Sequence, residues 1–393
     1  MTTPDVSARL PWDAADPYPF YEARRREGDV VWDDTAQAWL VLSYDVARQV
    51  LGGAGWTSDP LANPLARAAM AAVGQDFTSN SMLFADGDDH RRLRGSVRDV
   101  FTRSFITNLT AGLGTIATTL IDQRPVGAVF DFMSDIALPL PIAVIGAWLD
   151  LDPTSTELLR EVSPVIIRML GSLADHDETA AGAAASVTLM AEFLPMAADR
   201  RTHPGDDLLS FIAADPELSL EDVVMTAILV AVAGHETTAN LLGAGLIRLL
   251  APGPDETHIA DHIDPTDPAV VTELLRLDGP VQSTARTAIA DHIVGGVEIC
   301  SGQSALIAIA AANRDPAVFE EPARFRLDRN APAPLSFGYG AHYCLGAALA
   351  QLELTIALPK ILSRQPVLAG PVRWRDTPAI RGPLTVPMVF GAS

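Results

Sequence analysis

The chain has 393 residues, of which 48% are hydrophobic and 20% are charged, and its formal net charge is -21. This composition supplies a large buried core and excludes a disordered or fibrous chain. The acidic balance argues against nucleic acid as a partner, because phosphate groups would be repelled. Two cysteines are too few for a disulfide framework, and residues 1–20 lack the basic and apolar regions of a signal peptide. A cytoplasmic protein without membrane insertion is therefore expected.

Alanine and leucine dominate and runs of β-branched residues are short, which predicts a mainly helical fold. The N-terminal part is mixed. Residues 18–28 predict a short helix, residues 30–44 predict a hairpin that turns at 33–37, and the run DVARQVLG predicts a second helix. Residues 53–82 are rich in glycine, proline, asparagine and serine, which predicts a long, loosely structured connection.

A helical pattern then dominates from about Asp88 to Ala251. Within it, residues 163–200 predict two amphipathic helices joined by the alanine-rich segment ADHDETAAGAAA. A mobile lid and an ordinary helical hairpin both stay open for this region. The last quarter of the chain alternates short strands, turns and helices, and TAIADHIVGGVEI predicts a hairpin around Gly295-Gly296.

One long helix is predicted from Val223 to Leu250. Ser219 and Asp222 form a capping box before it, and Pro252 lies where it must end. Roughly thirty residues at ~1.5 Å each give a length on the order of 45 Å. The helix is apolar nearly all round, so it should be buried in the protein. Its uninterrupted apolar part is too short for a membrane span.

The centre of this helix reads AGHETT, residues 233–238. Gly234 weakens a helix interior, and Thr237 and Thr238 can bond backbone carbonyls one turn earlier. His235 and Glu236 place ionisable groups in an otherwise apolar helix. Such departures from local preference often mark function. A notch that touches solvent, with satisfied polar groups, is the structural alternative.

Cys344 lies just before a helical run, where the helix dipole and free N–H groups favour a thiolate. Four interpretations stay open. A zinc or iron–sulfur site needs more cysteines, and a Cys–His nucleophile lacks a recognisable oxyanion arrangement. A haem iron with one axial thiolate needs a single cysteine, and a structural cysteine needs nothing else. The surrounding loop contributes Phe337, Gly338, Gly340, His342 and Gly346.

These residues carry a resemblance to a known family. Phe337 to Gly346 matches in full the haem-binding signature F-G-x-G-x-H-x-C-x-G of the cytochrome P-450 family. AGHETT resembles the oxygen-activation motif of that family, and Glu273 with Arg276 matches its E-x-x-R pair. The resemblance spans roughly residues 15 to 393.

The resemblance implies a mainly α fold with small β-sheets, in which a long central helix crosses the haem within a triangular prism. Residues 1–393 would form a single haem-thiolate monooxygenase domain. Its N-terminal part, about 15–85, would be richer in β-structure, about 86–280 would form a helical body, and about 281–393 would be mixed and carry the cysteine. The implied cofactor is haem b (iron protoporphyrin IX), with the Cys344 thiolate as the iron ligand.

The resemblance also implies the roles of individual side chains. Thr237 would order a water beside dioxygen, and Glu236 would relay protons from solvent. Arg324 would complete a structural network with Glu273 and Arg276. The other cofactor-binding positions are Phe337, Gly338 and Gly346 in the cysteine loop and, at the propionates, His90, Arg94, Arg286 and His342.

The implied reaction inserts one oxygen atom from O2 into an apolar small molecule. Electrons would come from NAD(P)H through a separate ferredoxin reductase and ferredoxin, and a monomer is expected. A peroxide-dependent enzyme of the same family, a haem-based sensor and a cysteine hydrolase are the alternatives. Candidate docking residues for the carrier are Arg91, Arg92, Arg98 and Arg103, and candidate pocket residues are Met82, Leu83, Val230, Ala233, Val281, Gln282 and Val386.

Overall fold

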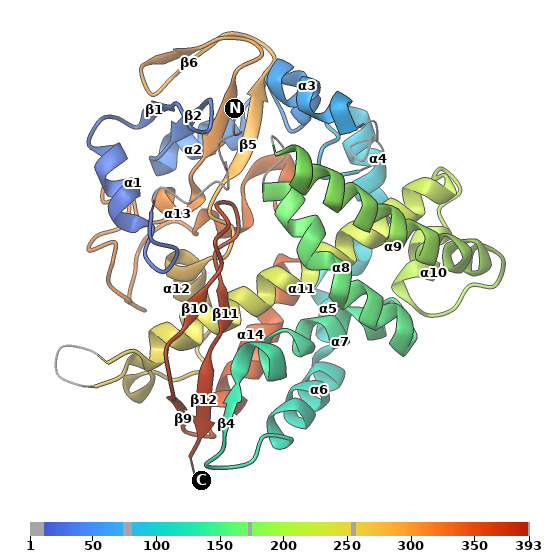
Figure 1. The fold of residues 1–393 in the computed structure, drawn as a ribbon, viewed down its shortest axis with the longest axis vertical. Coiled ribbons are helices and arrows are strands. Elements are labelled where there is room, and N and C mark those ends of the chain that lie inside the picture. The colour runs from blue at the N-terminus through green and yellow to red at the C-terminus, as the bar shows by residue number, and fades with distance from the viewer. Residues whose placement is uncertain (1–11, 74–80, 172–174, 253–256, 392–393) are drawn as a thin grey trace, which may run out of the picture.

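The computed structural model describes residues 12–73, 81–171, 175–252 and 257–391. Residues 1–11, on which the expectation of no export signal partly rests, lie outside the described residues. One long helix, α11 (Leu220–Leu250), crosses the middle of the molecule (Figure 1). A region rich in strands lies at one end of the molecule, and a mainly helical region lies next to that region.

Helices make up most of the described chain. They are α1 Tyr18–Arg25, α2 Tyr44–Gly52, α3 Pro64–Val73, α4 Gly87–Arg98, α5 Arg103–Thr107, α6 Thr110–Asp122, α7 Pro139–Trp148, α8 Pro153–Gly171, α9 His176–Thr202, α10 Leu208–Ala213, α11, α12 Pro268–Asp278, α13 Ile309–Ala312 and α14 Ala347–Leu362. The strands are β1 Val30–Asp33, β2 Ala38–Val41, β3 Trp56–Thr57, β4 Val129–Asp131, β5 Thr284–Ala288, β6 His292–Val294, β7 Val297–Ile299, β8 Ser304–Ile307, β9 Pro366–Leu368, β10 Arg373–Trp374, β11 Pro383–Thr385 and β12 Pro387–Phe390.

The largest sheet has five strands in the order β1-β2-β8-β5-β3. β1 and β2 form the predicted antiparallel hairpin, in which Trp32 lies opposite Trp39 with ring centroids 5.3 Å apart. β2 then pairs in parallel with β8, so segments from the two ends of the chain share one sheet. The predicted hairpin of β6 and β7 is also present, and Gly295 and Gly296 supply the positive φ angles of its turn.

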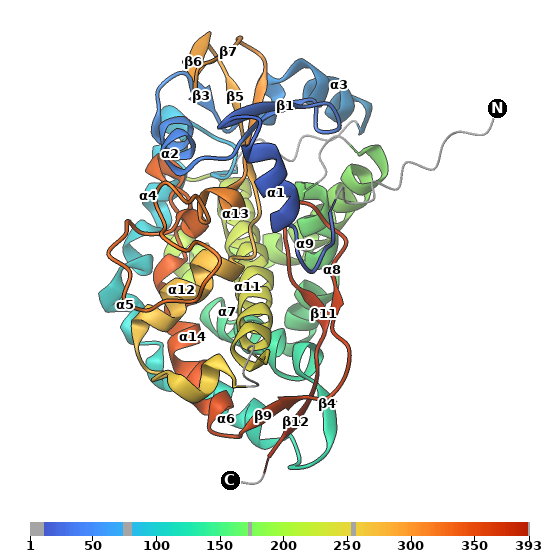
Figure 2. The same cartoon turned by 90° about the vertical axis from the view of Figure 1, so that its left-hand side faces the viewer.

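The long helix has the predicted capping box and begins at Leu220, three residues before the predicted Val223. The Ser219 side chain accepts a hydrogen bond from the Asp222 N–H, and the Asp222 carboxylate accepts one from the Ser219 N–H. This capping box satisfies two of the donors that a helix N-terminus leaves free. α11 ends at Leu250, two residues before Pro252, and it lies between other elements in both views (Figures 1 and 2).

The prediction of a loose connection over 53–82 is wrong for much of its length. β3, a short 3-10 turn and the ten-residue helix α3 occupy residues 56–73, while residues 74–80 lie outside the described part. The Asn63 carboxamide oxygen accepts hydrogen bonds from the N–H groups of Leu65 and Ala66, which starts α3. An Asn-Pro dipeptide that suggested a loop therefore acts as a helix N-terminus.

The two predicted helices over 163–200 are present, but the boundary between them is wrong. α8 reaches Gly171, and α9 begins at His176 after Asp175, whose carboxylate caps it. Residues 176–185 of the alanine-rich segment are therefore part of α9 rather than a linker. By length and composition α9 is the one helix of the described chain that could span a membrane, and 39% of its apolar window is buried within the molecule.

Two large hydrophobic clusters lie along α11. One joins its N-terminal half to α8 and α9, with Leu189 and Phe193 fully buried. The other joins its C-terminal half to α12, α14, β4 and β12. Because apolar contacts hold α11 along its length, its central residues are fixed in position relative to the rest of the protein.

Candidate active site

The cysteine loop has the backbone that its glycines predict. Gly338 and Gly340 have φ angles of 73° and 79°, which residues with a side chain rarely adopt. A Cβ atom on Gly340 would lie 2.9 Å from the Leu51 carbonyl oxygen. The Cys344 N–H donates a hydrogen bond to the Phe337 carbonyl at 2.8 Å, which closes the loop three residues before α14.

The Cys344 side chain is exposed, yet protein surrounds it closely enough that burial raises the pKa of the thiol. A side chain that solvent can reach within such dense surroundings lies in a recess rather than on an outer surface. The Gly346 N–H, which hydrogen-bonds the sulfur, and the nearby Arg94 guanidinium act in the opposite direction and stabilise a thiolate. The sulfur would therefore ionise to a thiolate when a metal cation binds in place of its proton.

A polar cluster lies beside this loop. The His90 and His342 rings are 4.2 Å apart, and His342 Nε2 lies 3.0 Å from Asp86 Oδ1. Burial alone would raise the pKa of Asp86, but hydrogen bonds from His342, Thr57 and Ser58 outweigh it and lower this pKa to about 2. Asp86 precedes α4 without capping it. Asp86 was not among the predicted site residues. A sequence feature that could have indicated it is its position four residues before His90.

Two of the four predicted propionate-binding side chains, His90 and Arg286, have no anionic hydrogen-bond partner among the described residues. His90 Nε2 is buried and has no hydrogen-bond partner. The Arg286 side chain is buried, and the hydrogen bond shown for it goes to the carbonyl of its neighbour Ala285. Burial lowers the pKa of both side chains, that of His90 to about 4. Buried donors of this kind fit an anionic group such as the carboxylates of haem.

Arg94 and His342 have other partners. Arg94 Nη2 donates to the Tyr343 carbonyl at 2.6 Å, and His342 is held by Asp86. Both groups lie beside the same loop as the orphan donors. The structure therefore brings the four predicted residues into one region but satisfies two of them within the protein.

The centre of α11 has one uncovered stripe. Most of its residues are buried, but Ala233 is exposed and Gly234 and Thr237 are half-buried. Ala233 and Thr237 are one turn apart, and the Thr237 hydroxyl donates to the Ala233 carbonyl at 2.9 Å. Thr238 lies on another face, buried, with its hydroxyl 3.2 Å from the Gly234 carbonyl. Of the two threonines, Thr237 is the one available to a bound molecule.

Glu236 is buried beside this stripe, and its partner was not predicted. Its Oε2 lies 2.9 Å from Nη1 of Arg375, which follows β10. The contact lacks hydrogen-bond alignment, since Glu236 Oε2 has no hydrogen-bond partner by distance and angle. The two residues are far apart in sequence and no motif links them, so only the fold reveals this ion pair.

A second buried acid lies on α14. Both carboxyl oxygens of Glu353 are buried without a hydrogen-bond partner, and burial raises the pKa of Glu353 to about 8 although the nearby Thr238 hydroxyl lowers it. Glu353 is therefore protonated at neutral pH. A signal existed in the sequence, because Leu349 and Ala357 lie one turn away on either side and place Glu353 on an apolar face.

This raised pKa predicts a pH-dependent stability. Between pH 4.5 and 8 the unfolded chain ionises Glu353 while the folded chain keeps the proton, so this group destabilises the fold progressively as the pH rises. Glu353→Gln cannot ionise. Its stability advantage over the wild type should grow by about 3 kcal/mol between pH 5 and pH 8. Urea denaturation at four pH values measures the difference, with the exposed Glu298→Gln as control. Parallel curves for wild type and Glu353→Gln would contradict the prediction.

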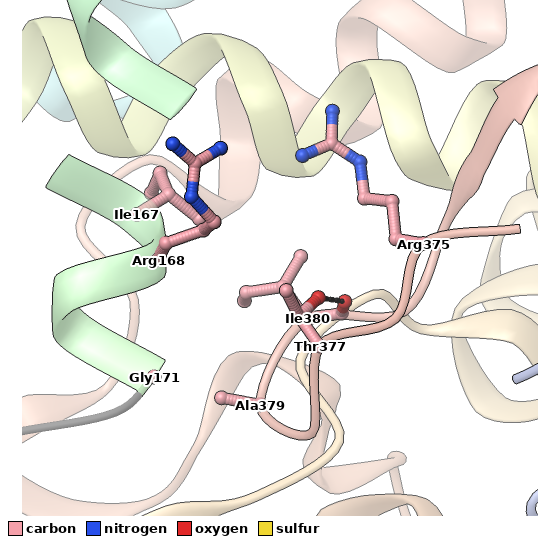
Figure 3. A pocket seen from close by; sticks show the side chains of 7 residues that line it. All are labelled: Ile167, Arg168, Gly171, Arg375, Thr377, Ala379 and Ile380. Atoms are coloured by element: carbon pink, nitrogen blue, oxygen red, sulfur yellow. Dashed lines mark hydrogen bonds between the residues drawn. The ribbon is translucent and has the colours of Figure 1, made fainter. Parts of the chain in front are cut away.

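The predicted pocket residues divide into several environments. Met82 and Val230 lie in the same apolar cluster, while Leu83 and Ala233 are exposed. The Gln282 N–H donates to the Ala379 carbonyl at 2.8 Å, and Val281 pairs with Ile380, so this segment runs beside the turn at 377–380. That turn, with α8, lines a small pocket (Figure 3).

The assignment of Val386 to the pocket is wrong. Val386 is fully buried in the second hydrophobic cluster, and its carbonyl accepts a hydrogen bond from the Phe132 N–H. The turn at 377–380, which precedes β11, lines the small pocket beside α8 instead.

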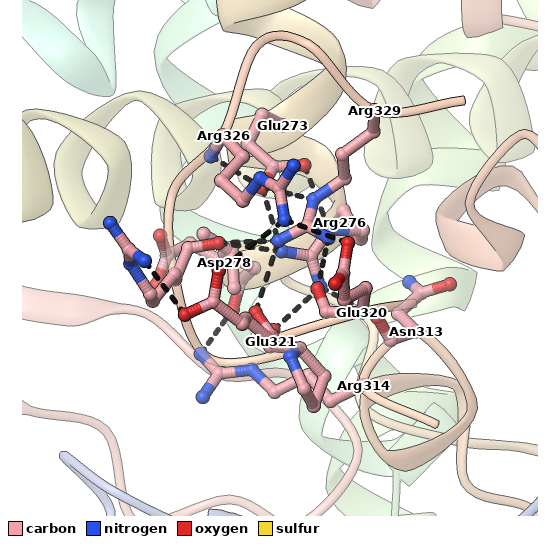
Figure 4. Close-up of polar contacts among 12 residues, drawn as sticks. Glu273, Arg276, Asp278, Asn313, Arg314, Glu320, Glu321, Arg326 and Arg329 are labelled. Atoms are coloured by element: carbon pink, nitrogen blue, oxygen red, sulfur yellow. Dashed lines mark hydrogen bonds and ion pairs between the residues drawn. The ribbon is translucent and has the colours of Figure 1, made fainter. Parts of the chain in front are cut away.

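The structural network around Glu273 is present, but with a different third arginine. Arg276 donates two hydrogen bonds to Glu273, at 2.7 and 2.8 Å, and Arg329 Nε donates one at 2.9 Å (Figure 4). The Arg324 side chain instead pairs with the exposed Glu321 and offers only its backbone carbonyl to Arg276. The prediction for Arg324 is therefore wrong.

The predicted basic patch for a carrier protein is largely neutralised. Arg91 pairs with Asp88, Arg92 with Asp222 and Arg98 with Asp99. The side chain of Arg103 lies outside the described residues. The described arginines of this group thus offer little uncompensated charge to an acidic partner.

The fold and the cysteine loop place the chain among haem-thiolate oxygenases, and comparison with known proteins bears this out. The cytochrome P450 family profile matches residues 265–372. Cytochrome P450 107B1 of Saccharopolyspora erythraea is 33% identical over 100% of both chains, and cytochrome P450 monooxygenase PikC of Streptomyces venezuelae is 33% identical over 95% of this chain and 91% of that protein. Ligand-free CYP164A2 of Mycobacterium smegmatis superposes with a TM-score of 0.87 at 30% identity over 96% of each chain.

The chain belongs to the cytochrome P450 family. It is a cytochrome P450 monooxygenase, an oxidoreductase of a family that uses haem iron, O2 and small-molecule substrates. The expected mainly helical fold with small sheets and a long central helix is confirmed.

Proposed function

We propose that this enzyme binds haem b through the Cys344 thiolate and inserts one oxygen atom from O2 into an apolar small molecule. The observation that carries the proposal is the Cys344 sulfur, which lies in a recess of the protein, accepts a hydrogen bond from the Gly346 N–H and has the unpartnered His90 Nε2 beside its loop. A bound haem supplies the redox chemistry that activates dioxygen. We also propose that residues 1–393 form one domain.

The chain's own residues would hold the cofactor by charge and shape. His90 and Arg286 provide the buried donors for the propionates, and Arg94 adds a second guanidinium near the cysteine. Asp86 orients the His342 ring, so His342 would bind a propionate only in competition with that carboxylate. Gly338 and Gly340 allow the loop to approach a flat molecule, and Phe337 adds an apolar ring.

Proton delivery is assigned to the centre of α11. The Thr237 hydroxyl, on the uncovered stripe, orders a water, and Glu236 supplies protons to it. Arg375 holds the Glu236 carboxylate in place by an ion pair.

Electrons come from NAD(P)H through a separate ferredoxin reductase and ferredoxin, and the enzyme is a cytoplasmic monomer. The substrate is a hydrophobic molecule such as a terpenoid, steroid, fatty acid, aromatic compound or polyketide intermediate. Support comes from the apolar residues near the α11 stripe, among them Met82, Val230 and Ile380.

Thr237→Ala tests the proposed oxygen chemistry. Without the hydroxyl that orders a proton-donating water, we expect NAD(P)H consumption to continue while product per NAD(P)H falls by about tenfold or more and hydrogen peroxide is released. The assay uses a surrogate ferredoxin and reductase with the tightest-binding member of a panel of apolar compounds, scored by the spin state of the ferric haem.

Thr188→Ala is the matched control. Thr188 also lies in a helix and bonds a carbonyl one turn earlier, but it is exposed on α9. Product formation at the wild-type ratio in Thr237→Ala would refute its role. A wild-type protein that consumes no NAD(P)H with any panel member would refute the monooxygenase proposal.

A further inference from the structure

Two arginines line the small pocket between α8 and the turn at 377–380. Arg168 comes from α8 and Arg375 from the end of β10, and both side chains extend toward α11 (Figure 3). Ile167, Ala379 and Ile380 supply the apolar part of the lining. Paired guanidinium groups beside apolar side chains are unexpected in a site that receives only hydrophobic molecules.

The acidic residues near these two arginines do not occupy all of the guanidinium N–H donors. Arg375 Nη1 faces Glu236, while its Nε is buried without a hydrogen-bond partner. Arg168 Nε reaches Glu178 at 3.3 Å, but the two side chains are 42% and 38% exposed, so this pair is weak. A guanidinium has five N–H donors, and toward the described residues the structure shows no further hydrogen bond from either group.

Each arginine has one acidic neighbour among the described residues, Glu236 for Arg375 and Glu178 for Arg168. What the pocket offers is therefore unused N–H donors rather than excess charge. An anion placed between the two guanidinium groups would satisfy donors that the protein leaves unused.

We propose that the substrate carries a carboxylate, which binds between Arg168 and Arg375 while its apolar body lies against Ile380 and Ile167. The fork of a guanidinium matches the two oxygens of a carboxylate. This inference rests on the proposed function and narrows its substrate class to amphipathic acids.

The test compares acids with their neutral counterparts. Dodecanoic acid, cholic acid and 1-naphthoic acid are each titrated against the corresponding methyl ester, using the spin-state change of the haem-loaded enzyme and equilibrium dialysis. We expect the wild type to bind at least one acid about tenfold more tightly than its ester, equal to about 1.4 kcal/mol.

Arg168→Gln should remove this preference while leaving ester binding unchanged. Arg168 is chosen because Arg375 also holds Glu236. Arg160→Gln is the control, since Arg160 lies on the same helix but pairs with Glu157 on the exposed surface. The proposal is overturned if every acid binds no better than its ester, if none of the acids binds, or if Arg168→Gln keeps the acid preference.

The two proposals fail separately. Equilibrium dialysis reports acid binding without any spectral signal from haem. A haem-thiolate spectrum without acid preference would overturn the carboxylate site alone. A protein that cannot bind haem would overturn the proposed function, whatever dialysis shows.

Discussion

Cys344→Ala is expected to abolish the thiolate-type absorption spectrum of the haem-loaded, reduced and carbon monoxide-bound protein, and to reduce turnover to background. Alanine offers no axial ligand, and the Gly346 N–H would lose the sulfur that it hydrogen-bonds. The loop itself should survive, because the Cys344 N–H bond to the Phe337 carbonyl belongs to the backbone. Far-ultraviolet circular dichroism checks that α14 remains folded.

Cys300→Ala is the matched control for this experiment. Cys300 is the other cysteine of the chain, and it is also exposed, at the end of β7. It lies in the connection between β7 and β8, where its N–H donates a hydrogen bond to the Gln303 side-chain oxygen at 2.9 Å. We expect Cys300→Ala to keep both spectrum and turnover. A thiolate spectrum in Cys344→Ala, or its loss in Cys300→Ala, would place the iron ligand elsewhere.

Glu273→Gln should produce the largest loss of stability. Glu273 and Arg276 are almost completely buried, and Arg329 is 10% exposed, so removing the carboxylate leaves two buried guanidinium groups without their counter-charge. Burial alone would raise the pKa of Glu273, but the bonds from Arg276 and Arg329 lower it. Breaking a buried pair costs about 3–5 kcal/mol. Urea denaturation of the haem-loaded protein measures the loss.

Glu321→Gln is the control, since Glu321 pairs with Arg324 on the surface and should contribute less than about 1 kcal/mol. If Glu273→Gln does not fold, Arg329→Gln supplies the measurement, because it keeps the Glu273–Arg276 pair and should lose a smaller amount. Equal stability of Glu273→Gln and Glu321→Gln would contradict the buried network.

The features that could be predicted from sequence are those that local chemistry determines. The capping box at Ser219, the hairpin turn at Gly295-Gly296 and the glycine-rich loop before α14 each depend on residues a few positions apart. The buried position of α11 followed from its apolar surface. The cysteine loop could be assigned because its pattern is long and contains few variable positions.

The features that were missed depend on contacts between distant segments. Arg329 rather than Arg324 reaches Glu273, a choice that the path of the 320–329 loop decides. Arg375 pairs with Glu236 only because the β10–β11 hairpin lies against α11. Helix α3 was obscured by the proline and asparagine that in fact initiate it. In each case several local outcomes had similar energies, and the tertiary contacts selected one.

The parallel pairing of β2 with β8 has a consequence for biosynthesis. β2 emerges from the ribosome early, but the edge that receives β8 stays unpaired until residues 304–307 have been added. At about 5–20 residues per second this interval lasts on the order of ten to fifty seconds. Leu40 and Val41, buried in the finished protein, are exposed beside an open strand edge for that time. The nascent chain should therefore depend on chaperone protection until translation is nearly complete.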